Sequence, residues 1–148
     1  MKRERFKIGP YVALILRKND TILLIRRYKT ENWNGFYACA GGGVDGNEPI
    51  TQAMIREARE ELGITLHKEN LRVVHVLHTK ERDGDTETVG FFLEATVWSG
   101  EPQNMEPHKH DDLAWFPVHK LPQNTMPALK HVMAQVQQNI FYSEFGWD

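Results

Sequence analysis

A glycine-rich turn that runs directly into an acid-rich segment constrains this chain more than any other stretch. Residues 41–64 read GGGVDGNEPITQAMIREAREELGI. At about 100° per residue, helical spacing places Glu57, Glu60 and Glu61 within an arc of roughly 100°. Like charges three and four residues apart on a helix repel one another by a few tenths of a kcal/mol per exposed pair. If this segment is helical, it therefore needs a counter-charge.

A divalent cation is the natural counter-charge. Mg²⁺ and Mn²⁺ take oxygen ligands in near-octahedral geometry, and clustered carboxylates with a backbone carbonyl from the glycine turn supply such oxygens. Arg56, four residues before Glu60, is close enough to hold one carboxylate in place. The alternative is a solvated acidic face, which the segment EAREE alone does not exclude.

The ends and the apolar face of this helix can be assigned from single residues. Pro49 suits the first turn and Gly63 suits the end. Ile55, Ala58 and Leu62 share the face that we expect to meet the core. The acidic face then lies away from the main apolar contact.

The rest of the chain predicts a mixed sheet with helices packed on it. A second helix is predicted at 125–139, and strands are predicted at 10–17, 21–27, 36–40, 71–79, 88–98 and 113–118. The first two strands form a hairpin signal. No repeat, low-complexity tract or linker divides the sequence, so we expect a single domain over residues 1–148.

Charge and apolar content narrow the class of partner. A net charge of −2 over 148 residues gives no reason to expect a nucleic-acid polymer or an anionic membrane. No apolar stretch approaches the length of a membrane span, and the N-terminus lacks the apolar run of a signal peptide. The single cysteine, Cys39, cannot form an internal disulfide and is interpreted as a small core residue. We therefore expect a cytoplasmic protein.

The spacing within the first stretch resembles the Nudix box, G-x5-E-x7-R-E-U-x-E-E-x-G-U. Gly42 begins the match, Glu48 and Arg56 follow at the required spacing, and Ala58 and Ile64 fill the two hydrophobic positions. Every fixed position of the box is present. The order of hairpin, box, strands and late helix also resembles a whole Nudix domain. The resemblance implies an α/β fold, with a mixed β-sheet sandwiched between helices (α/β/α).

The resemblance also implies a chemistry. Nudix enzymes hydrolyse a nucleoside diphosphate linked to another group and use Mg²⁺ or Mn²⁺ as cofactor. The implied metal ligands are the carboxylates of Glu57, Glu60 and Glu61 and the backbone carbonyl of Gly41. An ion pair between Glu48 and Arg56 would orient the glycine turn, and with the three glutamates it forms the expected catalytic group. The general base is left open among the glutamates and the acids of a later loop.

A competing pattern overlaps the glycine turn. Gly41-x-Gly43-x-x-Gly46 also fits the dinucleotide-binding fingerprint G-x-G-x-x-G, which is a weak signal in isolation. That fingerprint sets a pyrophosphate against a helix N-terminus. Here the helix is lined with glutamates, which repel bare phosphates unless metals intervene. We therefore reject the dinucleotide interpretation.

Candidate substrate-binding residues lie outside the box. Arg27 ends the second predicted strand, where some family members place a cation on the phosphates; a surface arginine is the alternative. Trp33, Asn34 and Phe36 belong to a WNGF stretch that is similar to a base-contacting stretch of an oxidised-purine triphosphatase of the family. The two aromatic residues could instead pack the loop onto the sheet. The acidic run that completes that enzyme's base pocket has no counterpart, and the nearest stretch is residues 126–129 (MPAL).

Residues 101–122 resemble the nucleotide triphosphate diphosphatase (MutT homologue 2) branch and are expected to form the base-side wall. This favours a small-molecule nucleotide substrate, namely a nucleoside triphosphate (deoxynucleotides and their oxidised forms included), cleaved to monophosphate and pyrophosphate. Markers of the ADP-ribose and dinucleoside polyphosphate groups are missing at residues 79–84. Two alternatives stay open: hydrolysis of another nucleoside diphosphate derivative such as a nucleotide sugar, and a non-catalytic module that senses a nucleotide. Inactive modules usually lose a glutamate of the box, and this box retains all of them.

A later loop holds a second group of potential metal ligands. His108 and His110, followed by Asp111 and Asp112, have alternate spacing that can bind a metal, although such short motifs usually do not. Glu106 and the two aspartates could instead complete the catalytic metal cluster. A structural role for Glu106 in shaping the loop is the simpler interpretation.

The C-terminal tail, YSEFGWD, is rich in aromatic residues. Such a tail either packs on the core or covers a partner subunit. A homodimer is therefore left open.

Overall fold

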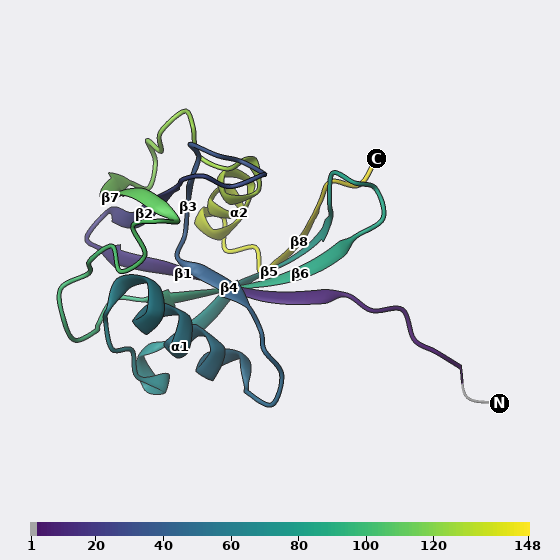
Figure 1. Ribbon diagram of the computed structural model, residues 1–148, viewed down its shortest axis with the longest axis horizontal. Coiled ribbons are helices and arrows are strands. Elements are labelled where there is room, and N and C mark those ends of the chain that lie inside the picture. The colour runs from purple at the N-terminus through teal and green to yellow at the C-terminus, as the bar shows by residue number, and fades with distance from the viewer. Residues whose placement is uncertain (1–2) are drawn as a thin grey trace.

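The computed structural model describes residues 3–148, and it has a mixed sheet with one α-helix on each face (Figure 1). The helices are α1 (Ile50–Leu62), the short 3₁₀ turn η1 (Lys68–Asn70) and α2 (Pro127–Gln137). The strands are β1 (Gly9–Lys18), β2 (Thr21–Arg27), β3 (Tyr37–Ala38), β4 (Gly41–Gly43), β5 (Arg72–Lys80), β6 (Glu87–Ala95), β7 (His110–Pro117) and β8 (Tyr142–Phe145). The predicted α/β/α class is confirmed.

Strand β1 lies at the centre because its side chains are buried on both faces. Val12 and Leu14 point into a core that also contains the apolar face of α1. Ala13 and Ile15 point into a second core, which contains the apolar side chains of α2. A strand covered on both faces reads as a continuous apolar run, and this explains the sequence PYVALILR.

The strand order is β3-β2-β1-β6-β5-β8, with β4 added on β1 and β7 on β2. The predicted hairpin is present, but β1 and β2 pair only beside the turn, where Arg17 faces Ile22 and Lys18 faces Thr21. Beyond that point the two strands separate. Strand β1 continues along β6 in parallel, whereas β2 pairs with β7.

Three elements differ from the sequence-based prediction. The glycine turn contains a strand, β4, that pairs antiparallel with β1. Strand β7 begins at His110, earlier than the predicted start at residue 113. The tail forms β8, which pairs in parallel with β5. No helix among residues 3–148 has the length and apolar composition needed to cross a membrane.

Candidate active site

Helix α1 carries the acidic residues to the edge of β4. Its start follows the extended backbone of Pro49, and its end is the left-handed Gly63 (φ 70°), whose N–H donates to the Arg59 carbonyl. Ala58 and Leu62 are fully buried on the core face, as predicted. This packing holds the helix against the sheet, with Glu57 and Glu61 against the glycine strand and Glu60 more exposed.

Glycine at position 42 allows the Glu57 carboxylate to lie directly against the backbone. A Cβ at Gly42 would stand 2.5 Å from Glu57 Oε1. A side chain larger than hydrogen at that position would therefore displace the carboxylate. Burial raises the pKa of Glu57, and repulsion from Glu60 and Glu106 adds to this, while Arg56 opposes it.

Glu61 is the most buried acid of the cluster, with 9% of its surface exposed. The Gly41 N–H donates a hydrogen bond to Glu61 Oε1 (2.6 Å). In the antiparallel pair of β4 with β1, the backbone groups of Gly42 point toward β1. Those of the neighbouring Gly41, its N–H and its carbonyl, therefore point away from β1, on the side of α1. Burial raises the pKa of Glu61 to about 7, and the neighbouring carboxylates of Glu57 and Glu106 raise it further, against the lowering effect of the Gly41 hydrogen bond.

Arg56 holds the acids and the glycine strand together. Its Nε and Nη2 donate to both oxygens of Glu48 (3.1 and 2.9 Å), and its Nη1 donates to Glu57 (2.9 Å) and Glu60 (3.4 Å). Nη2 also donates to the Gly43 carbonyl (3.2 Å). The ion pair expected between Glu48 and Arg56 is thus formed, and Arg56 lowers the pKa of Glu48.

The number of contacts at Arg56 leads to a prediction about stability. Arg56→Ala leaves Glu48 and Glu57 without the cation that they share. We expect a loss of about 2 kcal/mol in the free energy of unfolding, less than for a fully buried ion pair because these side chains are partly exposed. Urea unfolding in EDTA measures this. Arg59→Ala on the same helix is the matched control, since Arg59 donates only to Thr65 Oγ1 among the contacts described. Equal stability of the two variants would contradict the role given to Arg56.

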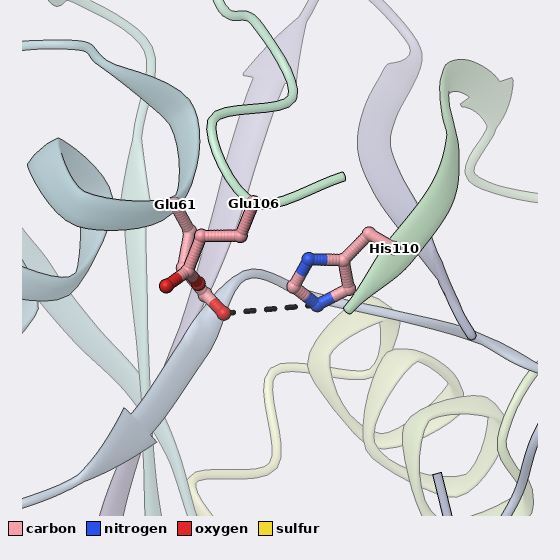
Figure 2. A group of neighbouring side chains, drawn as sticks. All are labelled: Glu61, Glu106 and His110. Carbon is pink, nitrogen blue, oxygen red and sulfur yellow. Dashed lines mark ion pairs between the residues drawn. The ribbon is translucent and has the colours of Figure 1, made fainter. Parts of the chain in front are cut away.

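The loop before β7 brings two more ligand-type side chains to Glu61. Backbone N–H groups of Gln103 and Met105 donate to the free carbonyls at the end of α1, which fixes the loop on the helix. As a result Glu106 and His110 lie beside Glu61, with ligand atoms all within 4.8 Å of one another (Figure 2). His110 Nε2 is 3.7 Å from Glu61 Oε2, and burial lowers the pKa of His110.

The structure locates each of the acids and histidines of the later loop. Glu106 and His110 lie beside Glu61, and the Glu106 carbonyl also accepts hydrogen bonds from the N–H groups of Lys109 and His110 within the loop. His108 is exposed and is not part of this group. Asp111 pairs with Arg26 (2.7 Å), and Asp112 accepts a hydrogen bond from the Tyr37 hydroxyl.

The donor set fits a hard divalent cation. Among the described residues, Glu61 and Glu106 bring their carboxylates together with His110, whereas the predicted ligands Glu57 and Glu60 lie next to this group and are bound to Arg56. The acids outnumber the cationic side chains paired with them, which are Arg56 and, on Glu106, Lys109. Oxygen ligands with excess negative charge are the chemistry that Mg²⁺ and Mn²⁺ require.

A cavity of about 620 Å³ opens on the other side of β4, between α2 and the tip of the β5–β6 hairpin. All three glycines of β4 line it, and each also contacts the acidic cluster: Gly41 through Glu61, Gly42 beside Glu57 and Gly43 through Arg56. The remaining lining residues are Tyr11, Val12, Ala13, Arg27, Trp33, Ala38, Cys39, Thr79, Lys80, Glu81, Arg82, Gly84, Phe92, Met126, Pro127, Ala128, Leu129, Phe145, Gly146 and Asp148.

The predicted substrate-binding residues divide into two groups. Arg27 and Trp33 line the cavity, and Trp33 has a left-handed backbone (φ 58°) that is uncommon for a bulky residue. Phe36 packs edge-on against Trp33 with ring centroids 5.1 Å apart, and Asn34 is exposed; neither lines the cavity. None of residues 101–122 lines this cavity, because that segment packs on the end of α1 and pairs with β2.

Sequence reasoning missed most of the cavity. Cys39, interpreted as a core residue, packs partly buried against the α2 core and also lines the cavity; burial raises the pKa of its thiol to about 12. Thr79 is buried, and its hydroxyl has no hydrogen-bond partner among residues 3–148. Cys39 follows β3 and Thr79 lies in β5, so no local motif could have grouped them.

Comparison with known proteins relates this arrangement to one family. The NUDIX domain model matches residues 7–136. The ADP-ribose pyrophosphatase of Methanocaldococcus jannaschii is 30% identical over 124 residues, which cover 82% of this chain and 70% of that protein. The CTP pyrophosphohydrolase of Escherichia coli is 30% identical over 111 residues, 74% of this chain and 76% of that protein. The crystal structure of a MutT NUDIX hydrolase from Burkholderia pseudomallei superposes with a TM-score of 0.80 at 31% identity, covering 88% of this chain and 99% of that chain.

Proposed function

This chain belongs to the Nudix family, and on that premise we propose that it is a pyrophosphohydrolase dependent on Mg²⁺ or Mn²⁺. Its substrates are nucleoside triphosphates, including deoxynucleotides and oxidised ones, which it cleaves to the monophosphate and pyrophosphate. The observation that carries the proposal is the shared strand β4. One side of this strand contacts the acidic cluster, and the other opens into a cavity of about 620 Å³, which suits a nucleoside.

The phosphates then lie over the glycines, and the nucleoside enters the cavity. Glu57, Glu60, Glu61 and the Gly41 carbonyl would hold the metal. When bound, the metal neutralises the phosphates, stabilises charge in the transition state and lowers the pKa of an attacking water. Because β4 has no side chains, its backbone can approach the phosphates closely.

The chain's own side chains position the substrate. Arg27 lines the cavity, its guanidinium donates to the Asn32 carbonyl (3.2 and 3.1 Å), and we assign it the role of pairing with a phosphate. Trp33 and Phe92 offer ring surface to the base. The proton of the attacking water goes to one of the carboxylates of the acidic cluster, Glu106 included.

A second candidate is hydrolysis of a nucleoside diphosphate linked to a sugar. The similarity to the ADP-ribose pyrophosphatase of Methanocaldococcus jannaschii favours it, since that similarity extends over 82% of this chain. The two candidates share the acidic cluster and differ in what fills the cavity.

A panel of four substrates tests the proposal: dGTP, 8-oxo-dGTP, dCTP and ADP-ribose. The measurement is kcat/KM for each, with release of pyrophosphate and of orthophosphate measured separately. We expect several triphosphates to be cleaved with release of pyrophosphate. Discrimination among them should lie within roughly ten- to two-hundredfold, because the α2 side of the cavity offers the apolar stretch Met126–Leu129 and no buried acidic pair to read the base.

Two outcomes would change the assignment. A preference for 8-oxo-dGTP of about a thousandfold or more would require polar groups that read the base, which the α2 side of the cavity does not offer, and would overturn the expected weak discrimination. Cleavage of ADP-ribose alone would replace the triphosphate proposal by the second candidate.

A further inference from the structure

The last nine residues, 140–148, lie beyond the segment that matches the family domain, which ends at residue 136. Strand β8 within them pairs in parallel with β5, from Val76 opposite Tyr142 to Thr79 opposite Phe145. In Figure 1 this strand runs beside β5 at the edge of the sheet. We refer to residues 140–148 as the C-terminal strap.

A chain of hydrogen bonds fixes the strap to the sheet and to α2. His75 Nδ1 faces the Ile140 carbonyl oxygen (2.8 Å), which can only accept, so this nitrogen carries the proton. In the neutral ring Nε2 then accepts from the Ser143 hydroxyl (2.7 Å). The Ser143 oxygen is left to accept from His131 Nε2, which lies 2.9 Å away on α2. With a neutral His75 the three hydrogen bonds run in one direction, and together they hold Ser143 between β5 and α2.

The end of the strap is held over the last residue of β5. Gly146 has φ 84°, and a Cβ there would overlap the Lys80 carbonyl oxygen. The Trp147 indole N–H donates to the His78 carbonyl (3.2 Å), and the Lys80 ammonium lies 5.2 Å from the Trp147 ring centre. The end of the strap therefore lies in close contact with the backbone of β5.

The two faces of β8 have different surroundings. Phe145 is partly buried, its ring centre is 5.3 Å from that of His131, and it lines the cavity together with Gly146 and Asp148. Tyr142 is 48% exposed, and Glu144, two residues along on the same face, accepts a hydrogen bond from the Tyr142 hydroxyl. One face of the strap thus belongs to the cavity, and the other belongs to the surface.

We propose that the C-terminal strap is a substrate-binding element, in which Phe145 forms the wall against the nucleoside, and Ser143 is the positioning residue that holds this wall in place. The inference rests on the proposed function, because it needs the nucleoside to occupy the cavity. The contacts described for the strap are with β5 and α2 and not with the acidic cluster. The strap therefore acts on nucleoside binding and leaves the phosphate end unchanged.

The experiment measures kcat and KM for the triphosphate that the wild type cleaves best, and the inhibition constant of inorganic pyrophosphate, which has no nucleoside. Phe145→Ala should raise KM about tenfold or more through lost ring contact, with kcat nearly unchanged and the pyrophosphate inhibition constant unchanged. Ser143→Ala should shift KM in the same direction, and Ser143→Thr, which keeps the hydroxyl, should restore it. Tyr142→Ala removes an aromatic ring from the outer face of the same strand and is the matched control, with KM as in the wild type.

The outcomes separate the two proposals. A wild type that cleaves no nucleotide of the panel overturns the proposed function and the strap with it. An active wild type with an unchanged KM in folded Phe145→Ala overturns the strap alone, as does an equal rise in the pyrophosphate inhibition constant. If Ser143→Ala fails to fold by circular dichroism, Phe145→Ala against Tyr142→Ala decides the matter.

Discussion

Glu61→Gln is expected to lower kcat by more than about a hundredfold, since loss of groups that only support metal ligands already costs ten- to a hundredfold. Glutamine keeps the size of the side chain, and its amide oxygen can still accept the hydrogen bond from the Gly41 N–H. The substitution therefore removes one negative charge and little else. Glu60→Gln should lower kcat to a similar extent, although Glu60 is more exposed. Steady-state kinetics at saturating Mg²⁺ measures both effects.

The same variants should not be less stable without metal. Burial raises the pKa of Glu61, and the nearby carboxylates of Glu57 and Glu106 raise it further, so a neutral replacement removes both the cost of burying charge and this repulsion. We expect the Tm of Glu61→Gln in EDTA to be equal to or slightly above that of the wild type. Glu69→Gln is the control, because Glu69 is exposed on η1, outside the cluster. Turnover near that of the wild type in both cluster variants would show that the roles assigned to these glutamates are wrong.

Excess EDTA is expected to abolish hydrolysis completely, and Mg²⁺ or Mn²⁺ should restore it. A triphosphate brings further negative charge to a cluster in which carboxylates already outnumber their cationic partners, so binding without a divalent cation is opposed by repulsion. Activity assays across a titration of free metal measure the requirement. Hydrolysis that continues undiminished in excess EDTA would remove the metal-dependent proposal.

Thermal unfolding provides a readout of the cation that does not depend on activity. Any ligand that binds the folded chain alone raises its stability by mass action. Mg²⁺ or Mn²⁺ should therefore raise the Tm of the wild type, and should raise that of Glu61→Gln less. Na⁺ at equal ionic strength separates binding from general screening of the acidic charges. Equal shifts with Na⁺ and Mg²⁺ would contradict a specific site.

The acidic helix shows what the sequence by itself determined. Spacing along one segment predicted the start of α1 near Pro49, its end at Gly63 and the buried face that contains Ala58 and Leu62. The ion pair of Glu48 with Arg56, which the structure contains, was implied by the family resemblance instead. The helix ends and the buried face depend on residues close in the chain, for which helical periodicity and local capping are sufficient.

The fold class was predictable for a related reason. Alternation of apolar runs with turn residues marked most strands, and the family resemblance supplied their order. The pairing was not predictable in the same way: β1 and β2 form a hairpin only at the turn and then separate to different partners. A strand that is apolar on both faces fits several neighbours equally well, so its partner depends on the whole sheet.

Only the tertiary structure placed Glu106 and His110 beside Glu61, through backbone hydrogen bonds between the loop and the end of α1. It also assembled the cavity from β1, β5, α2 and the C-terminal strap, whose Phe145 lies far along the chain from Trp33 on another part of the wall. Such residues have no fixed separation in the sequence. Their proximity follows from long-range packing and from the closing of long loops, which local sequence patterns do not reveal. Local spacing determined the acidic helix, and long-range packing decided which side chains lie opposite it.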